Sequence, residues 1–397
     1  MNFENKQRRI LLFSPKGSGE HYYGPGMNAF KMYKTLTENS GYQISLAHGY
    51  KEQKKYSVFK HQYFISDIVN KKPLLGLKFM YRANKWINKN YQKFDLVHCL
   101  TSFHHSFMFA LWFEKKGIPA VIKIGQSDHT GFNSNSLQSK LAGLNRYRVK
   151  HANQISGFIS LSPEIRSKLE FAGIQSDRIH DIPNGVETSV FKSVEKKKKS
   201  ELRASLQLKD VFTVLFTGAF SERKNPLLIA KAFSKYKLNE NIQLLLIGPD
   251  TDGGIQRKEI KNLIKQEQIK NIFVKDHVND IVKYYQISDL FVLPSSQEGF
   301  SNSMLEAQAC GLPALVTKIS GAVELIQEGI NGKFIERDTE SLYCGIDLYF
   351  QDNQRVRKEA INAQNIVNEK YSMEKILLKY LDVFDTKISN THSLNGI

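Results

Sequence analysis

Two glutamates, Glu298 and Glu306, lie eight positions apart around a glycine turn. The four residues 290–293 are all apolar, which is typical of a parallel strand that is buried on both faces. After the turn, residues 303–310 can form a helix. A helix that begins beyond the carboxyl end of such a strand directs unpaired N–H groups and its positive dipole end outward. We therefore predict a phosphate-binding site at this turn.

The turn supplies the groups that this site needs. Gly299 lets the backbone approach a ligand closely, and the expected amide donors to a diphosphate belong to Phe300, Ser301, Asn302 and Ser303. Glu298 and Glu306 can accept hydrogen bonds from sugar hydroxyls on either side of that diphosphate. A structural alternative stays open, because Ser303 and Glu306 also form the pattern of a capping box that closes the helix start.

The surrounding sequence resembles the family 4 retaining glycosyltransferases of the GT-B fold. Their hallmark is a glutamate, seven residues and a second glutamate, set here in PSSQEGFSNSMLEAQACGLP (294–313). Other segments that resemble the family are IPNGVETSVF (182–191), TVLFTGAFSERKNPLLIAKAF (213–233), QLLLIGP (243–249), SGAVELI (320–326) and NGKFI (331–335). The resemblance is strong over 182–335 and weak over the first 180 residues.

The resemblance implies an α/β fold of the GT-B class, with two doubly wound Rossmann-like domains that face a central cleft. A length of 397 residues also favours two domains. We expect an acceptor-binding domain over 1–192 and a nucleotide-sugar-binding domain over 193–370. A helix over 371–387 is expected to cross back to the first domain, followed by a flexible tail over 388–397.

Apolar runs predict the strands that build these domains. They lie at 9–14, 42–47, 94–100, 118–124, 155–160, 178–182, 211–217, 243–248, 272–274 and 290–293. The charged run from Glu195 through Lys199 is expected to be a solvated linker.

The strand at 211–217 leads into a second group of candidate donor-site residues. Gly218 follows it directly, and Arg223 and Lys224 precede a predicted helix. Similar proteins place a cation here against the donor diphosphate, and a fixed cation stabilises the negative charge of a departing nucleoside diphosphate. Many relatives have arginine directly after this glycine, where the present chain has Ala219. Either Arg223 compensates, or fewer charges hold the phosphate.

The first domain offers weaker candidates. Gly17 lies in a glycine-rich loop after the first strand (residues 15–30), which either approaches a phosphate or acceptor or is an ordinary connection. Histidines follow two predicted strands, at His104 and His105 and at His129. Many relatives place a substrate-contacting histidine in these loops, and His129 is the one we expect to act. Surface or structural roles are the alternative for each.

The net charge of +17 is concentrated in the first half of the chain. Residues 1–192 carry +15 and residues 193–397 carry +2. Residues 51–93 hold 11 basic and 2 acidic residues among many aromatic ones. This mixture favours an anionic membrane surface, with an apolar helix face from Leu74, Leu75, Leu77, Phe79 and Met80. A solvated basic face is the alternative, and no nucleic-acid partner is expected because no such motif accompanies the charge.

Other features bound the class of protein. Three cysteines fit a reducing compartment, and no apolar stretch approaches the roughly 20 residues that span a bilayer. We expect a cytoplasmic location, with peripheral binding to the inner face of the cell membrane as an option. Asp250, Thr251 and Asp252 form a DxD pattern, but the GT-B resemblance and the following glycines argue against a metal role. We expect no cofactor and metal-independent activity.

The function that this sequence predicts is retaining transfer of a sugar from a nucleotide diphosphate sugar, with a UDP-sugar favoured. The acceptor would be a hydroxyl of a glycan or a lipid-linked acceptor, in bacterial cell-surface polysaccharide synthesis. Glu298, Lys224 and His129 are the expected catalytic residues. Two alternatives stay open: a nucleotide-sugar epimerase with the same fold, and a non-catalytic protein that binds nucleotide sugars or polyanions.

Overall fold

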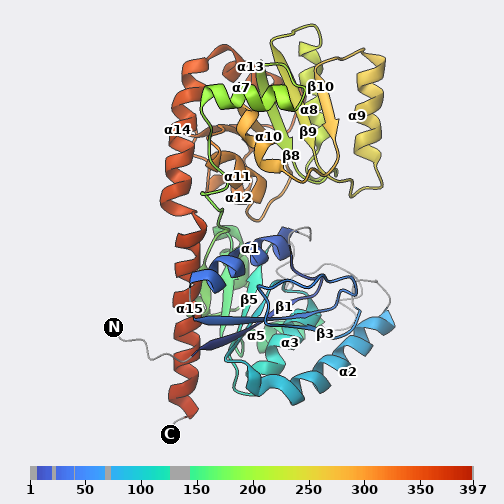
Figure 1. Cartoon of the computed structure of the whole chain (residues 1–397). Coiled ribbons are helices and arrows are strands. Elements are labelled where there is room, and N and C mark those ends of the chain that lie inside the picture. The colour runs from blue at the N-terminus through green and yellow to red at the C-terminus, as the bar shows by residue number, and fades with distance from the viewer. Residues whose placement is uncertain (1–6, 20–23, 40, 68–72, 126–143, 396–397) are drawn as a thin grey trace. The chain divides into compact units, whose positions relative to one another are not determined.

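The computed structural model describes residues 7–395 apart from 20–23, 40, 68–72 and 126–143. The chain forms two compact units. Unit 1 comprises Met1–Gly185 and Met373–Ile397, and unit 2 comprises Val186–Ser372. Each unit contains a wholly parallel sheet with helices packed on it (Figure 1), so the predicted α/β class is confirmed.

Unit 1 is built on a seven-stranded sheet in the order β3-β2-β1-β4-β5-β6-β7. Its strands are β1 (Arg8–Ser14), β2 (Tyr42–His48), β3 (His61–Phe64), β4 (Leu96–Cys99), β5 (Ala120–Ile124), β6 (Gly157–Ser160) and β7 (Ile179–Asp181). Its helices are α1 (Gly24–Asn39), α2 (Pro73–Asn90), α3 (His104–Glu114), α5 (Leu144–Ala152), α6 (Pro163–Phe171) and α15 (Met373–Asn395).

The alternation of side chains along β1 assigns its two faces to different helices. Ile10 and Leu12 belong to the core that α1 and α15 cover, together with Tyr33 and Phe384. Phe13 points to the other face, where it stacks on Phe109 of α3 with ring centroids 4.1 Å apart. A strand covered on both faces must be apolar throughout, which is why the run at 9–14 was readable from the sequence.

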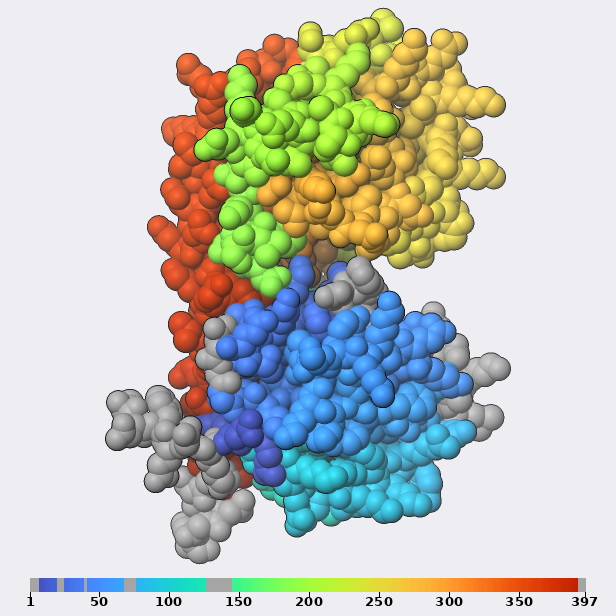
Figure 2. Space-filling view, in the orientation of Figure 1, coloured from blue at the N-terminus to red at the C-terminus, as the bar shows by residue number. Residues whose placement is uncertain are grey.

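Helix α2 departs from the apolar face expected for it. Phe79 is fully buried and lies 5.9 Å from Phe13, measured between ring centroids, so it belongs to the core. Leu77 of the expected face is exposed at 71%, as is its neighbour Tyr81 at 70%, while the side chains of Leu74 and Leu75 lie outside the described residues. Figure 2 shows the blue surface of this part of unit 1 facing the viewer. Within the described residues, no helix has the length and apolarity needed to cross a membrane.

Unit 2 is built on a six-stranded sheet in the order β10-β9-β8-β11-β12-β13. Its strands are β8 (Phe212–Thr217), β9 (Ile242–Ile247), β10 (Ile272–Lys275), β11 (Leu290–Leu293), β12 (Ala314–Thr317) and β13 (Gly332–Ile335). Its helices are α7 (Lys196–Ser205), α8 (Pro226–Phe233), α9 (Ile255–Gln266), α10 (Ile281–Ile287), α11 (Asn302–Ala309), α12 (Ser320–Val323), α13 (Thr339–Gln351) and α14 (Asn353–Lys370).

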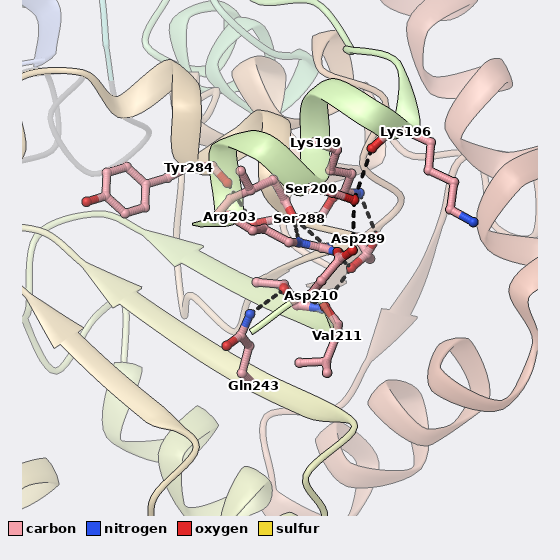
Figure 3. Close-up of polar contacts among 12 residues, drawn as sticks. Lys196, Lys199, Ser200, Arg203, Asp210, Val211, Gln243, Tyr284, Ser288 and Asp289 are labelled. Carbon is pink, nitrogen blue, oxygen red and sulfur yellow. Dashed lines mark hydrogen bonds and ion pairs between the residues drawn. The ribbon is translucent and has the colours of Figure 1, made fainter. Parts of the chain in front are cut away.

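The run expected to be a solvated linker forms helix α7, which is fixed to the sheet (Figure 3). Asp289 accepts from Lys199 at 2.6 Å and from Arg203 at 2.7 Å. Its Oδ2 also accepts from the backbone N–H of Thr213 at 2.8 Å. Arg203 is 6% exposed, and burial lowers the pKa of Lys199. Because their partner Asp289 stands 86 or more residues later, the sequence does not reveal that Lys199 of this run, and Arg203 just beyond it, are bound.

Three short strands escaped prediction. β3 is only partly buried and carries mixed polar residues, and β12 and β13 are four residues each. The C-terminal region also differs, because α15 continues to Asn395 where a loose tail was expected beyond Lys387. Ile388, which is 4% exposed, packs into the core of unit 1 and holds this last part of the helix.

Candidate active site

Strands β8 and β11 mark the position in unit 2 where the strand order reverses. From β8 the chain proceeds to β9 on one side, and β11 pairs with β8 on the other. In open α/β sheets, ligands bind beyond the carboxyl ends of the two strands at such a switch point. Gly218 follows β8 and Glu298 follows β11, so the topology brings together candidates that lie 80 residues apart in the chain.

Glycines allow the backbone segments at this edge to approach one another. Gly218 has a φ of +154° and Gly248 a φ of +152°, and a Cβ on Gly248 would lie 1.9 Å from the carbonyl oxygen of Gly218. A Cβ on Gly218 would lie 2.9 Å from Cδ of Lys224, so the lysine side chain passes directly over this glycine. On the β11 side, a Cβ on Gly321 would lie 2.5 Å from the carbonyl oxygen of Gly299.

Glu298 is the centre of a compact charged cluster. Its Oε1 accepts from Arg223 Nη1 at 2.8 Å and from Ser295 Oγ at 3.0 Å, and lies 3.1 Å from Lys224 Nζ. Arg223 also donates to the carbonyl of Gln297 at 2.6 Å. Although Glu298 is only 8% exposed and burial opposes its charge, Lys224 and Arg223 hold its pKa below the usual value. The cluster thus holds a charged, mostly buried carboxylate against two basic side chains.

Arg223 can supply the positive charge that is missing at position 219, where this chain has alanine in place of the relatives' arginine. Both cations of the sequence prediction, Arg223 and Lys224, reach the same carboxylate oxygen. They directly precede α8, whose N-cap Asn225 lies in the left-handed region at φ +49° and accepts from Leu228 N. The cap turns the chain sharply after Lys224.

Helix α11 begins at the predicted turn, but its cap differs from the capping box. The N-cap is Ser301, whose hydroxyl accepts from the backbone N–H of Met304 at 3.4 Å and lies 3.1 Å from the hydroxyl of Ser303. Phe300 is 5% exposed and Asn302, the first residue of the helix, is half-buried. The capping-box alternative, with Ser303 as N-cap and Glu306 closing the helix, is therefore wrong.

Glu306 is engaged elsewhere. The hydroxyl of Tyr285 donates to its Oε2 at 3.0 Å, and the same hydroxyl lies 2.6 Å from Oγ1 of Thr217. Tyr285 is fully buried, and burial, together with the charge of Glu306, raises its pKa well above the usual value. The phenol therefore stays protonated and orients the Glu306 carboxylate at the end of β8.

Sequence reasoning missed Ser295, Thr217 and Tyr285. Thr217 carried a signal, because it directly precedes Gly218 at the carboxyl end of a strand. Tyr285 gave none, since its position beside Glu306 depends on how α10 packs on β8. Among the other predicted residues, Gly17 lies in unit 1, where a φ of +83° requires glycine, and His129 lies outside the described residues.

The DxD pattern serves the fold. Asp250 forms an ion pair with Arg257 at 2.9 Å. Asp252 accepts from the backbone N–H groups of Gly254 and Gln256 at 3.0 and 3.1 Å and so caps the start of α9. Both carboxylates are thus committed to partners within unit 2.

Comparisons with known proteins agree with this architecture. The family model "Glycosyltransferase Family 4" matches residues 34–190, and "Glycosyl transferases group 1" matches residues 198–366. The Staphylococcus aureus capsular polysaccharide biosynthesis glycosyltransferase CapM is 26% identical over 209 residues, which are 51% of this chain and 53% of that protein. The Escherichia coli UDP-Gal:alpha-D-GlcNAc-diphosphoundecaprenol alpha-1,3-galactosyltransferase is 29% identical over 227 residues, 53% of this chain and 56% of that protein. The chain spans about half the length of the curated relatives it matches.

Solved structures match over nearly the whole chain. Anabaena Alr3699/HepE, in complex with UDP and glucose, has a TM-score of 0.77 at 19% identity and covers 96% of this chain and 100% of that one. WaaG, a glycosyltransferase involved in lipopolysaccharide biosynthesis, has a TM-score of 0.74 at 15% identity, with 94% and 99% covered. At these identities the likeness shows the fold. Together, the two family models, the glutamate pair at the switch point of unit 2 and the paired parallel sheets place this chain in the family 4 glycosyltransferases of the GT-B fold.

Proposed function

We propose that this protein transfers a sugar from a nucleotide diphosphate sugar to a hydroxyl group with retention of anomeric configuration. The observation that carries the proposal is the contact of Lys224 and Arg223 with Glu298 at the switch point of unit 2. Two cations beside a helix start suit a diphosphate, and a carboxylate beside them suits a sugar hydroxyl. A UDP-sugar is favoured, because the similar HepE structure holds UDP and a relative is named for UDP-Gal.

In the proposed reaction, the bond from the anomeric carbon to the donor phosphate oxygen breaks, and its electron pair stays on the phosphate. Lys224 and Arg223 stabilise that charge with the N–H donors that Glu298 does not use. The acceptor hydroxyl attacks from the same face and gives its proton to the leaving phosphate. Glu298 orients the donor sugar, and Glu306, held by Tyr285, binds the ribose.

Two side-chain cations can neutralise the diphosphate in this scheme, so we propose that no divalent metal is required. The acceptor is proposed to be a glycan or a lipid-linked glycan of bacterial cell-surface polysaccharide synthesis. The relatives named for capsular polysaccharide and for a diphosphoundecaprenol substrate support this assignment.

Donor binding should raise the melting temperature of the full chain. A ligand at about 100 times its Kd stabilises the folded state by about 2.7 kcal/mol. We expect UDP and one UDP-sugar to shift the melting temperature equally with and without EDTA, and Lys224→Ala to abolish the shift. Lys231→Ala, which removes an exposed lysine from α8, is the control and should keep it. A shift that survives in Lys224→Ala would remove this residue from the donor site.

We further propose that unit 1 binds the anionic inner face of the cell membrane through α2. The exposed residues Lys78, Arg82 and Lys85 lie next to exposed Leu77 and Tyr81 on this helix. Basic residues at an interface attract anionic lipid, and an adjacent apolar side chain inserts into it. This surface keeps Leu77 of the apolar face predicted from the sequence, whereas Phe79 of that face is buried.

The membrane proposal is tested by sedimentation with vesicles that contain phosphatidylglycerol. Each basic residue contributes about 1 kcal/mol, so K78Q/R82Q/K85Q should weaken binding about 100-fold at low salt. The matched control is K258Q/K261Q/K265Q, which removes three exposed lysines from α9 in unit 2. Equal binding by the two triple variants would contradict a specific role for α2.

A further inference from the structure

Unit 1 has a switch point of its own, between β1 and β4. From β1 the chain proceeds to β2 on one side, and β4 pairs with β1 on the other. Lys16 follows β1, while His104 and His105 begin α3 just after β4. The same physical rule that located the site in unit 2 therefore predicts a ligand at this edge. None of these side chains has a part in the donor chemistry proposed above.

Arg148 of α5 is a buried side chain beside this edge of the sheet. It is 4% exposed, and its Nη1 donates at 3.0 Å to the carbonyl of Ser102, two residues before α3. Its Nη2 donates at 2.7 Å to Oδ1 of Asn145, while Nε is buried and has no hydrogen-bond partner. Among the described ion pairs, no carboxylate balances this guanidinium. Burial lowers its pKa to about 10, which leaves it charged at neutral pH.

His104 adds a second unsatisfied group in the same place. Its Nδ1 is buried without a partner, and both burial and the nearby Arg148 charge lower its pKa. Burial, His104, Arg148 and Lys16 likewise lower the pKa of His105, to about 4. His104 and His105 begin α3 just after Ser102, the residue on which Arg148 is anchored. Leaving buried polar atoms unpaired is costly, and an anion that accepts from the Nε–H of Arg148 would satisfy one of them.

The N-terminus of α3 adds positive partial charge at the same place. This helix spans 11 residues, and its N-cap, Phe103, offers no side-chain acceptor to the first-turn N–H groups. Such a terminus carries a partial positive charge and directs several N–H groups outward. Arg148 is anchored on the residue that leads into this turn, so the guanidinium and the helix dipole act on one position.

We propose that Arg148, His104 and the first turn of α3 bind a phosphate group of the acceptor. The acceptor of the proposed transfer is then a phosphorylated compound, either a soluble phosphate monoester or a lipid diphosphate, and this identification rests on the proposed function. A guanidinium, a helix terminus and an imidazole in the tautomer with Nδ1–H can each donate to one of the several oxygens of a phosphate.

The test uses the full chain with Lys224→Ala, so that phosphate at the donor site does not obscure the result. Histidine ring resonances are followed by NMR as inorganic pyrophosphate is added, and the His104 signal is identified from its absence in His104→Gln. We expect the His104 signal to shift with pyrophosphate but not with acetate at equal ionic strength. Arg148→Gln should weaken this binding by about tenfold or more, because a charge-assisted donor is lost. Arg146→Gln removes an exposed arginine of the same helix and should leave it unchanged.

Arg148 is buried, so Arg148→Gln can lose stability. His104→Gln, at a half-buried position, provides the second variant, with pyrophosphate binding measured by calorimetry and expected to weaken in the same way. Equal responses to pyrophosphate and acetate, or equal losses in the Arg146 and Arg148 variants, would overturn the inference.

Two further experiments distinguish a soluble phosphate from a lipid diphosphate, and the acceptor site from the proposed donor chemistry. Tighter binding of farnesyl diphosphate than of glucose 1-phosphate assigns the site to a lipid diphosphate, and the reverse order assigns it to a soluble phosphate. A melting shift of the wild type with UDP but no His104 response overturns only the acceptor site. A His104 response without any UDP shift overturns only the proposed donor chemistry.

Discussion

Glu298→Gln should lower turnover by about 100- to 1,000-fold, the range found when one preorganised electrostatic contact is removed from an active site. The glutamine has nearly the same shape and still accepts a hydrogen bond. It carries no charge to balance Arg223 and Lys224, which lie 2.8 and 3.1 Å from the carboxylate. Their positions would shift, and the donor sugar would lose its carboxylate partner.

The same substitution should cost stability by about 1.5–3 kcal/mol at neutral pH, because hydrogen bonds to a charged group are lost. Its pH dependence follows from the depressed pKa of Glu298. Stability from this carboxylate is present above the usual value of 4.5 and is lost as pH falls through the lower folded-state pKa. The difference in the free energy of unfolding between wild type and Glu298→Gln should therefore become smaller at acid pH.

Urea unfolding at neutral and acid pH measures the effect on stability. Turnover is measured as the initial rate with the nucleotide sugar that raises the melting temperature. Glu340→Gln is the matched control, since Glu340 forms an exposed pair with Lys235 in the same unit. Turnover by Glu298→Gln close to that of Glu340→Gln would exclude Glu298 from the chemistry.

Gly321→Ala should weaken donor binding and lower turnover by about 100-fold, because a displacement of about 1 Å in a positioned group can slow a reaction by that factor. The new Cβ would lie 2.5 Å from the carbonyl oxygen of Gly299 and 2.9 Å from Cα of Phe300. These are backbone atoms, so no side-chain rotation relieves the clash. The turn that precedes α11 must move away, and its amides move with it.

The control for Gly321→Ala is a second glycine with an equal clash at a distance from the turn. A Cβ on Gly332 would lie 2.4 Å from the carbonyl oxygen of Ala314, at the start of β13. Both variants should lose about 1–3 kcal/mol from overpacking. Only Gly321→Ala should also lose affinity for UDP in calorimetry under conditions where both are folded. Equal UDP affinities in the two variants would show that the turn does not bind the donor.

The sequence alone indicated most of the strands and the candidate residues of the donor site. Parallel strands buried on both faces must be apolar throughout, so most strands are visible as short runs such as 290–293. The family motif around Glu298 and Glu306 then led to the predicted fold and family, both of which are confirmed. Gly218, Lys224 and Glu298 converge because each follows or flanks a strand of the same switch point.

The tertiary structure decided the roles that depend on distant partners. Whether Glu306 closed a helix or was available to a sugar hydroxyl was open in the sequence, and only the structure shows that Tyr285 donates to its carboxylate. Lys199 reads as part of a solvated charge run, and only the packing of α7 beside Asp289 buries it. Arg148 had no motif at all; its position beside Ser102, with no carboxylate partner among the described residues, exists only once α5 is packed against α3. Local periodicity records which face of an element is buried, whereas a charge acquires its partner from the whole fold.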